Sequence, residues 1–189
     1  MEWDYSLFKL INDRANDVSW LGRLFVDAAN YGDIYFVLSL AVIWIFNHKI
    51  SVYGVAAGVG AVLISRFVSI FYYRNRPFID HEVNQLLPHI ESNSFPSDHA
   101  AAAFAIATML YLFSKRTGLF FLLCASIVSF ARIWVGKHYP LDVICGTVIG
   151  ITLSVLLFHF LEKTRWYELA TGKWKSFRRN AETEVNGMR

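Results

Sequence analysis

The chain has 189 residues, of which 55% are hydrophobic and only 17% are charged. This apolar fraction exceeds that of ordinary soluble domains, so the composition predicts an integral membrane protein and leaves a soluble all-helical protein as the less favoured alternative. The net charge of +3 is small and dispersed, which argues against a nucleic-acid-binding surface. Cys124 and Cys145 lie inside apolar runs, where neither a disulfide nor a metal site is expected.

The first residues have no basic start followed by an apolar stretch and a small-residue cleavage site, so no signal peptide is predicted. The spacing of Phe8, Leu10 and Ile11 suits a short helix at the membrane interface, and a simple polar cap is an equal alternative. Residues 1–30 are therefore expected to form an interfacial or partly inserted segment. The sequence leaves open whether residues 18–30 add a sixth membrane segment.

Five apolar segments follow, at residues 33–47, 51–73, 98–113, 118–135 and 141–161. Several are shorter than the ~20 residues of an ideal span, and the first is expected to begin earlier. Together they predict an all-α fold, with residues 1–189 forming one polytopic bundle of five or six transmembrane helices. Gly146 and Gly150 have the spacing of a helix dimerisation face, so a homodimer is one interpretation, although packing within one chain is favoured.

Connections that are two spans apart lie on the same side of the membrane. With five spans, residues 74–97 and 136–140 share one side, and the tail at 162–189 lies on the other. That second side carries most basic residues outside the candidate site: Lys49, Lys115, Arg116, Lys163, Arg165, Lys173, Lys175, Arg178 and Arg179. By the positive-inside tendency the second side is cytoplasmic, and the first side lies at the outer surface of the cell membrane. The tail from residue 178 onwards is polar enough to be disordered.

Three short motifs fall on the predicted outer side. They are Arg76-Pro77, the string from Ser94 to His99 that reads Ser-Phe-Pro-Ser-Asp-His, and Arg132-x5-His138-x3-Asp142. Each motif alone is a weak signal. Together they supply arginines, a hydroxyl, histidines and a carboxylate at span ends that a polar lipid headgroup can reach.

These residue types suit phosphoryl transfer, whose transition state spreads negative charge over three oxygens and needs fixed donors around them. Arg76 and Arg132 are expected to bind phosphate, because a guanidinium stays charged and matches phosphate geometry. Ser97 precedes a predicted helix, so its hydroxyl and the first backbone amides could form an anion site. Asp98 either favours the helix dipole or contacts substrate or water, with equal weight.

His138 and Asp142 are four residues apart, and a helix beginning near residue 140 would bring the carboxylate to the imidazole. Such a carboxylate fixes the histidine tautomer and leaves the other ring nitrogen as a nucleophile. His99 would then act as general acid toward the leaving group. The alternative without catalysis is a polar cluster whose side chains only hydrogen-bond the unpaired backbone groups at the helix ends.

These residues resemble the type-2 phosphatidic acid phosphatase superfamily, whose pattern is Lys-x6-Arg-Pro, Pro-Ser-x-His and Ser-Arg-x5-His-x3-Asp. Asp98 stands at the usual glycine and Ala131 at the usual serine. The resemblance implies a helical membrane core, a phosphohistidine on His138 and no required metal or other cofactor. It also implies Asp142 as partner of His138, His99 as acid, and Arg76, Ser97 and Arg132 as phosphate ligands.

The main departure from that pattern is Ser69, which occupies the position of the family lysine. Arg66 lies one helical turn earlier and Arg74 lies in the following loop, so either could supply the missing charge. Arg66 is preferred, because an arginine in an apolar helix requires a partner.

The Ser-Phe-Pro-Ser-Asp-His-Ala and Tyr-x-Arg-Asn-Arg-Pro-Phe strings are similar to bacterial undecaprenyl-diphosphatases of the bacitracin-resistance type. This resemblance implies that a polyprenyl diphosphate is hydrolysed to recycle the lipid carrier of cell-wall synthesis. A phosphatidic acid or phosphatidylglycerophosphate phosphatase is the alternative within the enzyme class, and a transporter or antibiotic-immunity subunit is the alternative outside it. Besides its lipid phosphate substrate, the expected partners are membrane lipids.

The outer loop at residues 78–95 is long enough to act as a lid. Its titratable side chains could select the headgroup or bind a divalent ion, but a solvated loop face is favoured for them: Asp80, His81, Glu82, His89 and Glu91.

Overall fold

The computed structural model describes residues 2–15, 17–88 and 90–171, and it divides into two compact units, Met1–Val155 and Leu156–Arg189. Throughout the described residues the regular elements are helices: α1 (Glu2–Asn12), α2 (Trp20–Phe46), α3 (His48–Phe71), α4 (Pro77–Asp80), α5 (Asp98–Phe113), α6 (Lys115–Trp134), α7 (Pro140–Thr164) and α8 (Trp166–Thr171). The all-α prediction is confirmed. His89 and the tail residues 172–189 lie outside the described part. The predicted disorder of the tail and four of its basic residues, Lys173, Lys175, Arg178 and Arg179, therefore lie outside it too.

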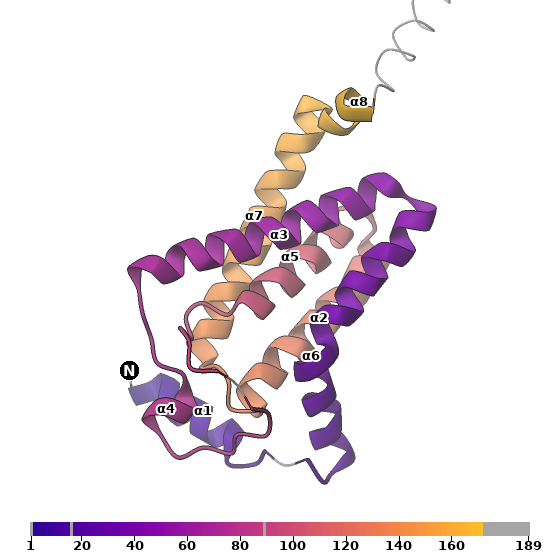
Figure 1. The fold of residues 1–189 in the computed structure, drawn as a ribbon. Coiled ribbons are helices and arrows are strands. Elements are labelled where there is room, and N and C mark those ends of the chain that lie inside the picture. Colours follow the sequence, from indigo (N-terminus) through magenta and orange to yellow (C-terminus); the bar gives the residue numbers. More distant parts are fainter. Residues whose placement is uncertain (1, 16, 89, 172–189) are drawn as a thin grey trace, which may run out of the picture. The chain divides into compact units, whose positions relative to one another are not determined.

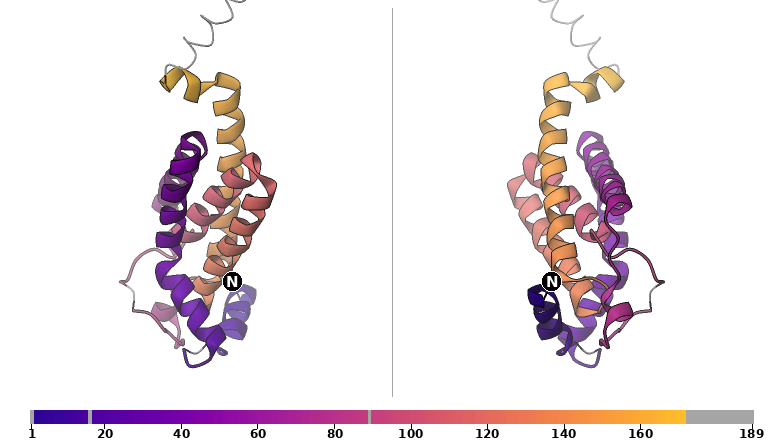
Figure 2. Two further views of the ribbon diagram at one scale, coloured as in Figure 1. Left: turned by 90° about the vertical axis from the view of Figure 1, so that its right-hand side faces the viewer. Right: turned by 90° about the vertical axis from the view of Figure 1, so that its left-hand side faces the viewer.

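Four helices are long and apolar enough to cross a membrane, namely α2, α3, α6 and α7, and α5 is a shorter apolar helix. These five coincide with the five apolar segments of the sequence. Within the first unit, α2 and α3 form one layer and α5 and α6 a second (Figures 1 and 2), with α2 packed on α6 and α3 packed on α5. The chain is thus a multi-pass membrane protein.

The α2 helix begins at residue 20, well before the apolar run that predicted it. The hydroxyl of Ser19 caps it by accepting from the amide of Gly22 at 3.0 Å. At 27 residues the helix is about 40 Å long, more than the hydrocarbon core requires. Residues 20–30 are therefore the first turns of one long helix and not a separate sixth segment.

The short α5 helix occupies the centre of the first unit. Five of its alanines are buried, at positions 100, 101, 103, 105 and 107. Small side chains let the neighbouring helices approach closely. A Cβ on Gly146 of α7 would lie 2.4 Å from the carbonyl oxygen of Ser97, and one on Gly150 would lie 2.4 Å from that of Ala101. This glycine face therefore packs inside the chain, against α5.

The amphipathic α1 helix packs onto the connection between α6 and α7. Phe8 is 1% exposed and meets the ring of Tyr139 edge-on, with centroids 5.5 Å apart. Asp4 is fully buried, and its carboxylate accepts from the amide of Leu141 at 2.9 Å. The helix thus fixes the first turn of α7, in addition to any contact with the membrane interface.

The loops that carry the sequence motifs meet at one end of the first unit. The α2–α3 turn at Asn47 lies at the end away from α1 and α4 (Figure 1), whereas residues 72–88, 90–97 and 135–139 lie beside them. The outer loop is held by Asn84, whose amide donates to Asn12 Oδ1 at 2.8 Å. The topology predicted from alternating spans accordingly brings the motifs together.

Candidate active site

A small pocket lies where the three motifs meet. Its volume is about 60 Å³, and it is lined by Ser69, Arg76, Asn93, Pro96, Asp98, His99 and His138. A space of this size suits a phosphoryl group and excludes a lipid chain. The ring of His99 comes from the first turn of α5 and that of His138 from the α6–α7 connection. Their centroids are 6.5 Å apart, so one group between them can contact both.

The two ring nitrogens of His138 have different partners. Nδ1 lies 2.9 Å from the carbonyl oxygen of Ser94, which can only accept, so Nδ1 carries the proton. Nε2 lies 3.1 Å from Nη1 of Arg76, which can only donate, so Nε2 holds the lone pair. Burial, reinforced by Arg76 and Arg132, lowers the pKa of His138 to about 4. At neutral pH His138 is therefore an uncharged imidazole with its nucleophilic nitrogen at the pocket.

Asp142 does not supply the hydrogen bond that the four-residue spacing predicted. Its Oδ2 is 3.8 Å from Nδ1 of His138 and instead accepts from the hydroxyl of Ser94 at 2.5 Å and the amide of Tyr139 at 2.9 Å. Because the loop before α5 inserts between the two side chains, Ser94 is the direct partner of the ring. Asp142 acts on His138 through Ser94 and through its charge.

His99 is held by a residue that the motifs do not contain. Its Nε2 lies 3.1 Å from Oδ2 of Asp33 on α2. No described group bonds Nδ1, the ring's other nitrogen. The Asp33 carboxylate favours the protonated form of the imidazole, which is the form that a general acid needs. Burial and the neighbouring cations Arg132, Lys137 and Arg76 act against it and favour the neutral ring.

Arg76 is buried and its guanidinium is aimed by backbone oxygens. Nη1 donates to the carbonyl of Lys137 at 2.9 Å and Nη2 to that of Asn93 at 3.2 Å. Burial lowers the pKa of Arg76, although nearby carboxylates oppose this shift. Its pocket-facing position and fixed orientation fit an anion ligand.

Arg132 lies behind the pocket, 2% exposed, with Nη1 donating to the carbonyl of Ala29 at 2.7 Å. Its Nε has no hydrogen-bond partner. A buried guanidinium nitrogen that is left unpaired is costly, which points to an anion in the functional state. Lys137 adds a third cation: burial together with Arg132 and Arg76 lowers its pKa to about 8, which is still above neutral pH.

Ser97 and Asp98 begin α5. The Ser97 hydroxyl accepts from the amide of Ala100 at 3.4 Å as a helix cap, and the Ser97 amide donates to the carbonyl of Asp142 at 3.0 Å. Ser97 is fully buried and is not part of the pocket lining, whereas Asp98 lines it.

The two arginines considered as replacements for the family lysine have different environments. Arg74 donates to Asp142 Oδ1 at 2.8 Å and to Asp4 Oδ2 at 2.6 Å. Burial opposes its charge, but these two carboxylates outweigh it and raise the pKa of Arg74. Arg66 is 71% exposed and pairs with Asp98, its Nε lying 3.3 Å from Oδ2. Neither arginine lines the pocket, where Ser69 itself donates to the carbonyl of Phe95 at 2.8 Å.

Sequence reasoning assigned no role to three residues of this site. Asp33 carried a signal, because an acidic residue beside an apolar run is costly unless it has a partner or a function. Ser94 was part of the second motif, but nothing local shows that it lies against His138. Asp4 carried no signal of its contact with Arg74. Among the described residues, no group of three histidine, cysteine or acidic side chains is arranged to hold a metal ion.

Comparison with known proteins identifies the family of the chain. The family model described as PAP2 superfamily matches residues 36–166. Undecaprenyl-diphosphatase BcrC of Bacillus subtilis (strain 168) is 32% identical over 166 residues, which cover 86% of this chain and 86% of the relative. Bacitracin transport permease protein BcrC of Bacillus licheniformis is 34% identical over 162 residues, 83% of this chain and 80% of the relative.

A solved structure is also similar along most of its length. The crystal structure of Aquifex aeolicus LpxE matches with a TM-score of 0.73 and 30% sequence identity, and the match covers 82% of this chain and 94% of that one. The resemblance inferred from the three motifs is confirmed, and the chain belongs to the PAP2 superfamily.

Proposed function

We propose that this PAP2 protein is a lipid phosphatase that hydrolyses undecaprenyl diphosphate to undecaprenyl phosphate and inorganic phosphate. The observation that carries the proposal is the state of His138: an uncharged imidazole whose Nε2 lone pair accepts from Arg76 at the edge of a pocket of phosphoryl size. Arg76 borders the same pocket, and Arg132 lies behind it with an unpaired nitrogen. The similarity to a protein named undecaprenyl-diphosphatase supports the choice of substrate.

In the first step, Nε2 of His138 attacks the terminal phosphorus. An N–P bond forms, the bond from phosphorus to the bridging oxygen breaks, and its electron pair leaves with the lipid phosphate. His99 gives its proton to that oxygen, while Arg76 and Arg132 stabilise the charge on the transferred group.

In the second step, water attacks the phosphohistidine and His99 takes the proton of that water. The N–P bond breaks, inorganic phosphate forms and the lone pair returns to Nε2 of His138. Ser94 and Asp142 hold the ring in one tautomer throughout both steps.

The proposed location of the site is the outer surface of the cell membrane. The basic residues of the α2–α3 and α5–α6 turns favour the cytoplasmic side for those turns, and the motif loops leave the bundle at the other end. Recycling of the cell-wall lipid carrier, with resistance to bacitracin, would follow from this location.

A substrate panel with purified protein tests the proposal. Phosphate release should be fastest with undecaprenyl diphosphate, and His138→Ala should lose it by at least about a thousandfold while keeping the thermal unfolding temperature. A preference for phosphatidic acid or phosphatidylglycerophosphate would contradict the proposed isoprenoid substrate, while the protein would still be a lipid phosphatase.

Transport is the second candidate, favoured by the name of the Bacillus licheniformis relative, a bacitracin transport permease protein. It predicts no turnover by the wild type and no effect of His138→Ala on bacitracin sensitivity. Trapping of ³²P on a residue other than His138 would contradict the assigned nucleophile.

A further inference from the structure

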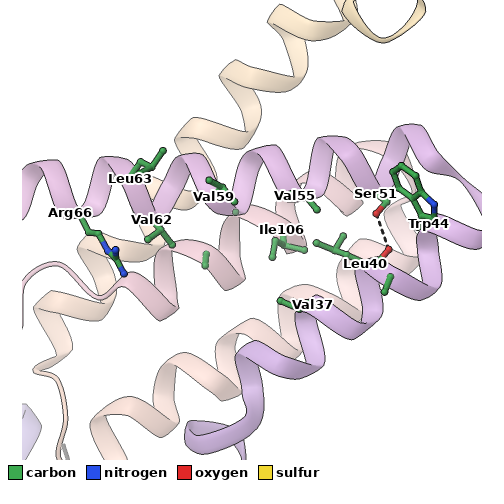
Figure 3. A pocket seen from close by; sticks show the side chains of 13 residues that line it. Val37, Leu40, Trp44, Ser51, Val55, Val59, Val62, Leu63, Arg66 and Ile106 are labelled. Carbon is green, nitrogen blue, oxygen red and sulfur yellow. Dashed lines mark hydrogen bonds between the residues drawn. The ribbon is translucent and has the colours of Figure 1, made fainter. Parts of the chain in front are cut away.

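A second, much larger hollow lies beside the catalytic pocket, between α2, α3 and α5. Its volume is about 650 Å³, within the range of ligand sites. Figure 3 shows that Arg66 stands at one end of it and Trp44 at the other, with aliphatic side chains between them. The hydroxyl of Ser51 in its wall donates to the carbonyl of Leu40 at 2.8 Å, so the surface along the hollow is apolar except at Arg66.

The hollow is a groove that follows α3 and opens sideways toward lipid. Its α3 residues recur at spacings of three and four positions, which places them on one face of the helix: Ser51, Val55, Gly58, Val59, Val62, Leu63 and Arg66. The ends of this stripe are fifteen positions apart, so the groove is about 22 Å long. Val59 and Leu63 are 55% and 62% exposed. A long, laterally open apolar groove of this volume fits one extended hydrocarbon chain.

Arg66 connects this groove to the catalytic pocket. Its Nε lies 3.3 Å from Oδ2 of Asp98, and Asp98 lines the pocket together with His99 and His138. The Arg66–Asp98 ion pair thus lies between the catalytic pocket, which suits a phosphoryl group, and the groove, which suits an apolar chain. At 71% exposure, the guanidinium has donors left for a further anion.

We propose that Arg66 and this groove form a leaving-group subsite, in which Arg66 binds the phosphate that stays on the lipid and the groove takes the start of its single chain. This subsite rests on the proposed function, and it selects lipid diphosphates over lipid monophosphates. When the terminal phosphate moves to His138, charge develops on the oxygen that remains with the lipid phosphate. A guanidinium stabilises that charge directly.

A lipid monophosphate presents a different leaving group to the same site. Its departing oxygen belongs to an alcohol, which must receive a proton and has no phosphate for Arg66 to hold. Loss of Arg66 should therefore lower kcat/KM for the diphosphate more than kcat/KM for the monophosphate.

The test compares farnesyl diphosphate with farnesyl monophosphate in lipid nanodiscs, because the two substrates share one tail. The ratio of their kcat/KM values should fall about tenfold to a hundredfold in Arg66→Gln. Asp98→Asn, which removes the competing carboxylate and keeps Arg66, should preserve or increase the ratio. Arg116→Gln is the matched control, because Arg116 is exposed at the first turn of α6, away from both pockets, and should not change the ratio.

A second measurement addresses the groove. Val59→Trp should reduce the preference for farnesyl over isopentenyl diphosphate about tenfold, since the new side chain fills the groove. Leu123→Trp, at an exposed position of α6 outside the groove, should leave the preference unchanged.

Equal losses on both farnesyl substrates in Arg66→Gln would overturn the leaving-group role of Arg66. An unchanged tail preference in Val59→Trp would overturn the assignment of the groove. Both outcomes differ from failure of the proposed function. In that case the wild type would hydrolyse neither substrate, or the His138→Ala variant would keep the activity of the wild type.

Discussion

The carbonyl oxygen of Ser94 lies 2.9 Å from Nδ1 of His138 and holds the proton of the imidazole on that nitrogen. The same serine donates its hydroxyl to Asp142 at 2.5 Å. Ser94, in the loop before α5, thus links His138 to Asp142, the carboxylate of the same sequence motif. The link explains how the ring keeps one tautomer without a direct carboxylate contact.

Ser94→Ala tests this linkage. The backbone carbonyl remains and the hydroxyl bond to Asp142 is lost, so kcat should fall about tenfold, less than in Asp142→Asn, which perturbs three hydrogen bonds. Phosphate release and thermal unfolding measure the two effects. Full activity of Ser94→Ala beside an inactive Asp142→Asn would mean that the carboxylate acts on the ring directly.

Asp33→Asn tests the support of His99. Removing the carboxylate at 3.1 Å destabilises the imidazolium, so the alkaline limb of the kcat/KM profile should move to lower pH and kcat should fall about tenfold to a hundredfold. The other titratable groups that act on His99 are left unaltered by this substitution: Asp98, Arg76, Arg132, Lys137 and His138. Asp27→Asn, on an exposed turn of the same helix, is the control. A lower kcat with an unmoved profile would assign Asp33 a purely structural role.

Stability should depend on pH because of His138. Its pKa is about 4 in the folded chain and 6.5 ordinarily, so between these values the unfolded chain binds the additional proton. The free energy of unfolding should therefore decrease as pH falls from 6.5 to about 4, and this contribution should level off below that. Thermal unfolding in detergent at several pH values measures the trend. His138→Gln should show a shallower dependence, and an equal slope would exclude His138 as its source.

Asp4→Asn tests the role of α1. The buried carboxylate accepts from Arg74 and from the amide of Leu141, so the amide replacement leaves Arg74 short of a partner and should cost about 2–3 kcal/mol of unfolding free energy. Activity should fall as well, because Arg74 also holds Asp142. Asp13→Asn, at an exposed pair with Lys9, should have little effect on thermal unfolding or turnover. Equal stability of the two variants would mean that α1 is not part of the site's support.

The sequence by itself determined the all-α membrane architecture, the five apolar helices and the end of the bundle at which the motifs gather. These follow from one-dimensional properties: the length of apolar runs, their alternation with polar connections, and the residue types that phosphoryl transfer needs. The periodicity of α2 did not show where it begins, because its first turns are mixed in polarity and the cap at Ser19 is a weak local signal.

Only the tertiary structure decided which partners the reactive groups have. Arg66 and Arg74 are both candidates for the missing charge along the chain, yet one pairs with Asp98 at a groove and the other is enclosed by Asp4 and Asp142. A hydrogen bond depends on atoms that meet within about 3 Å. Residues 4 and 74 are seventy positions apart, so no local pattern could reveal their contact before the helices are packed.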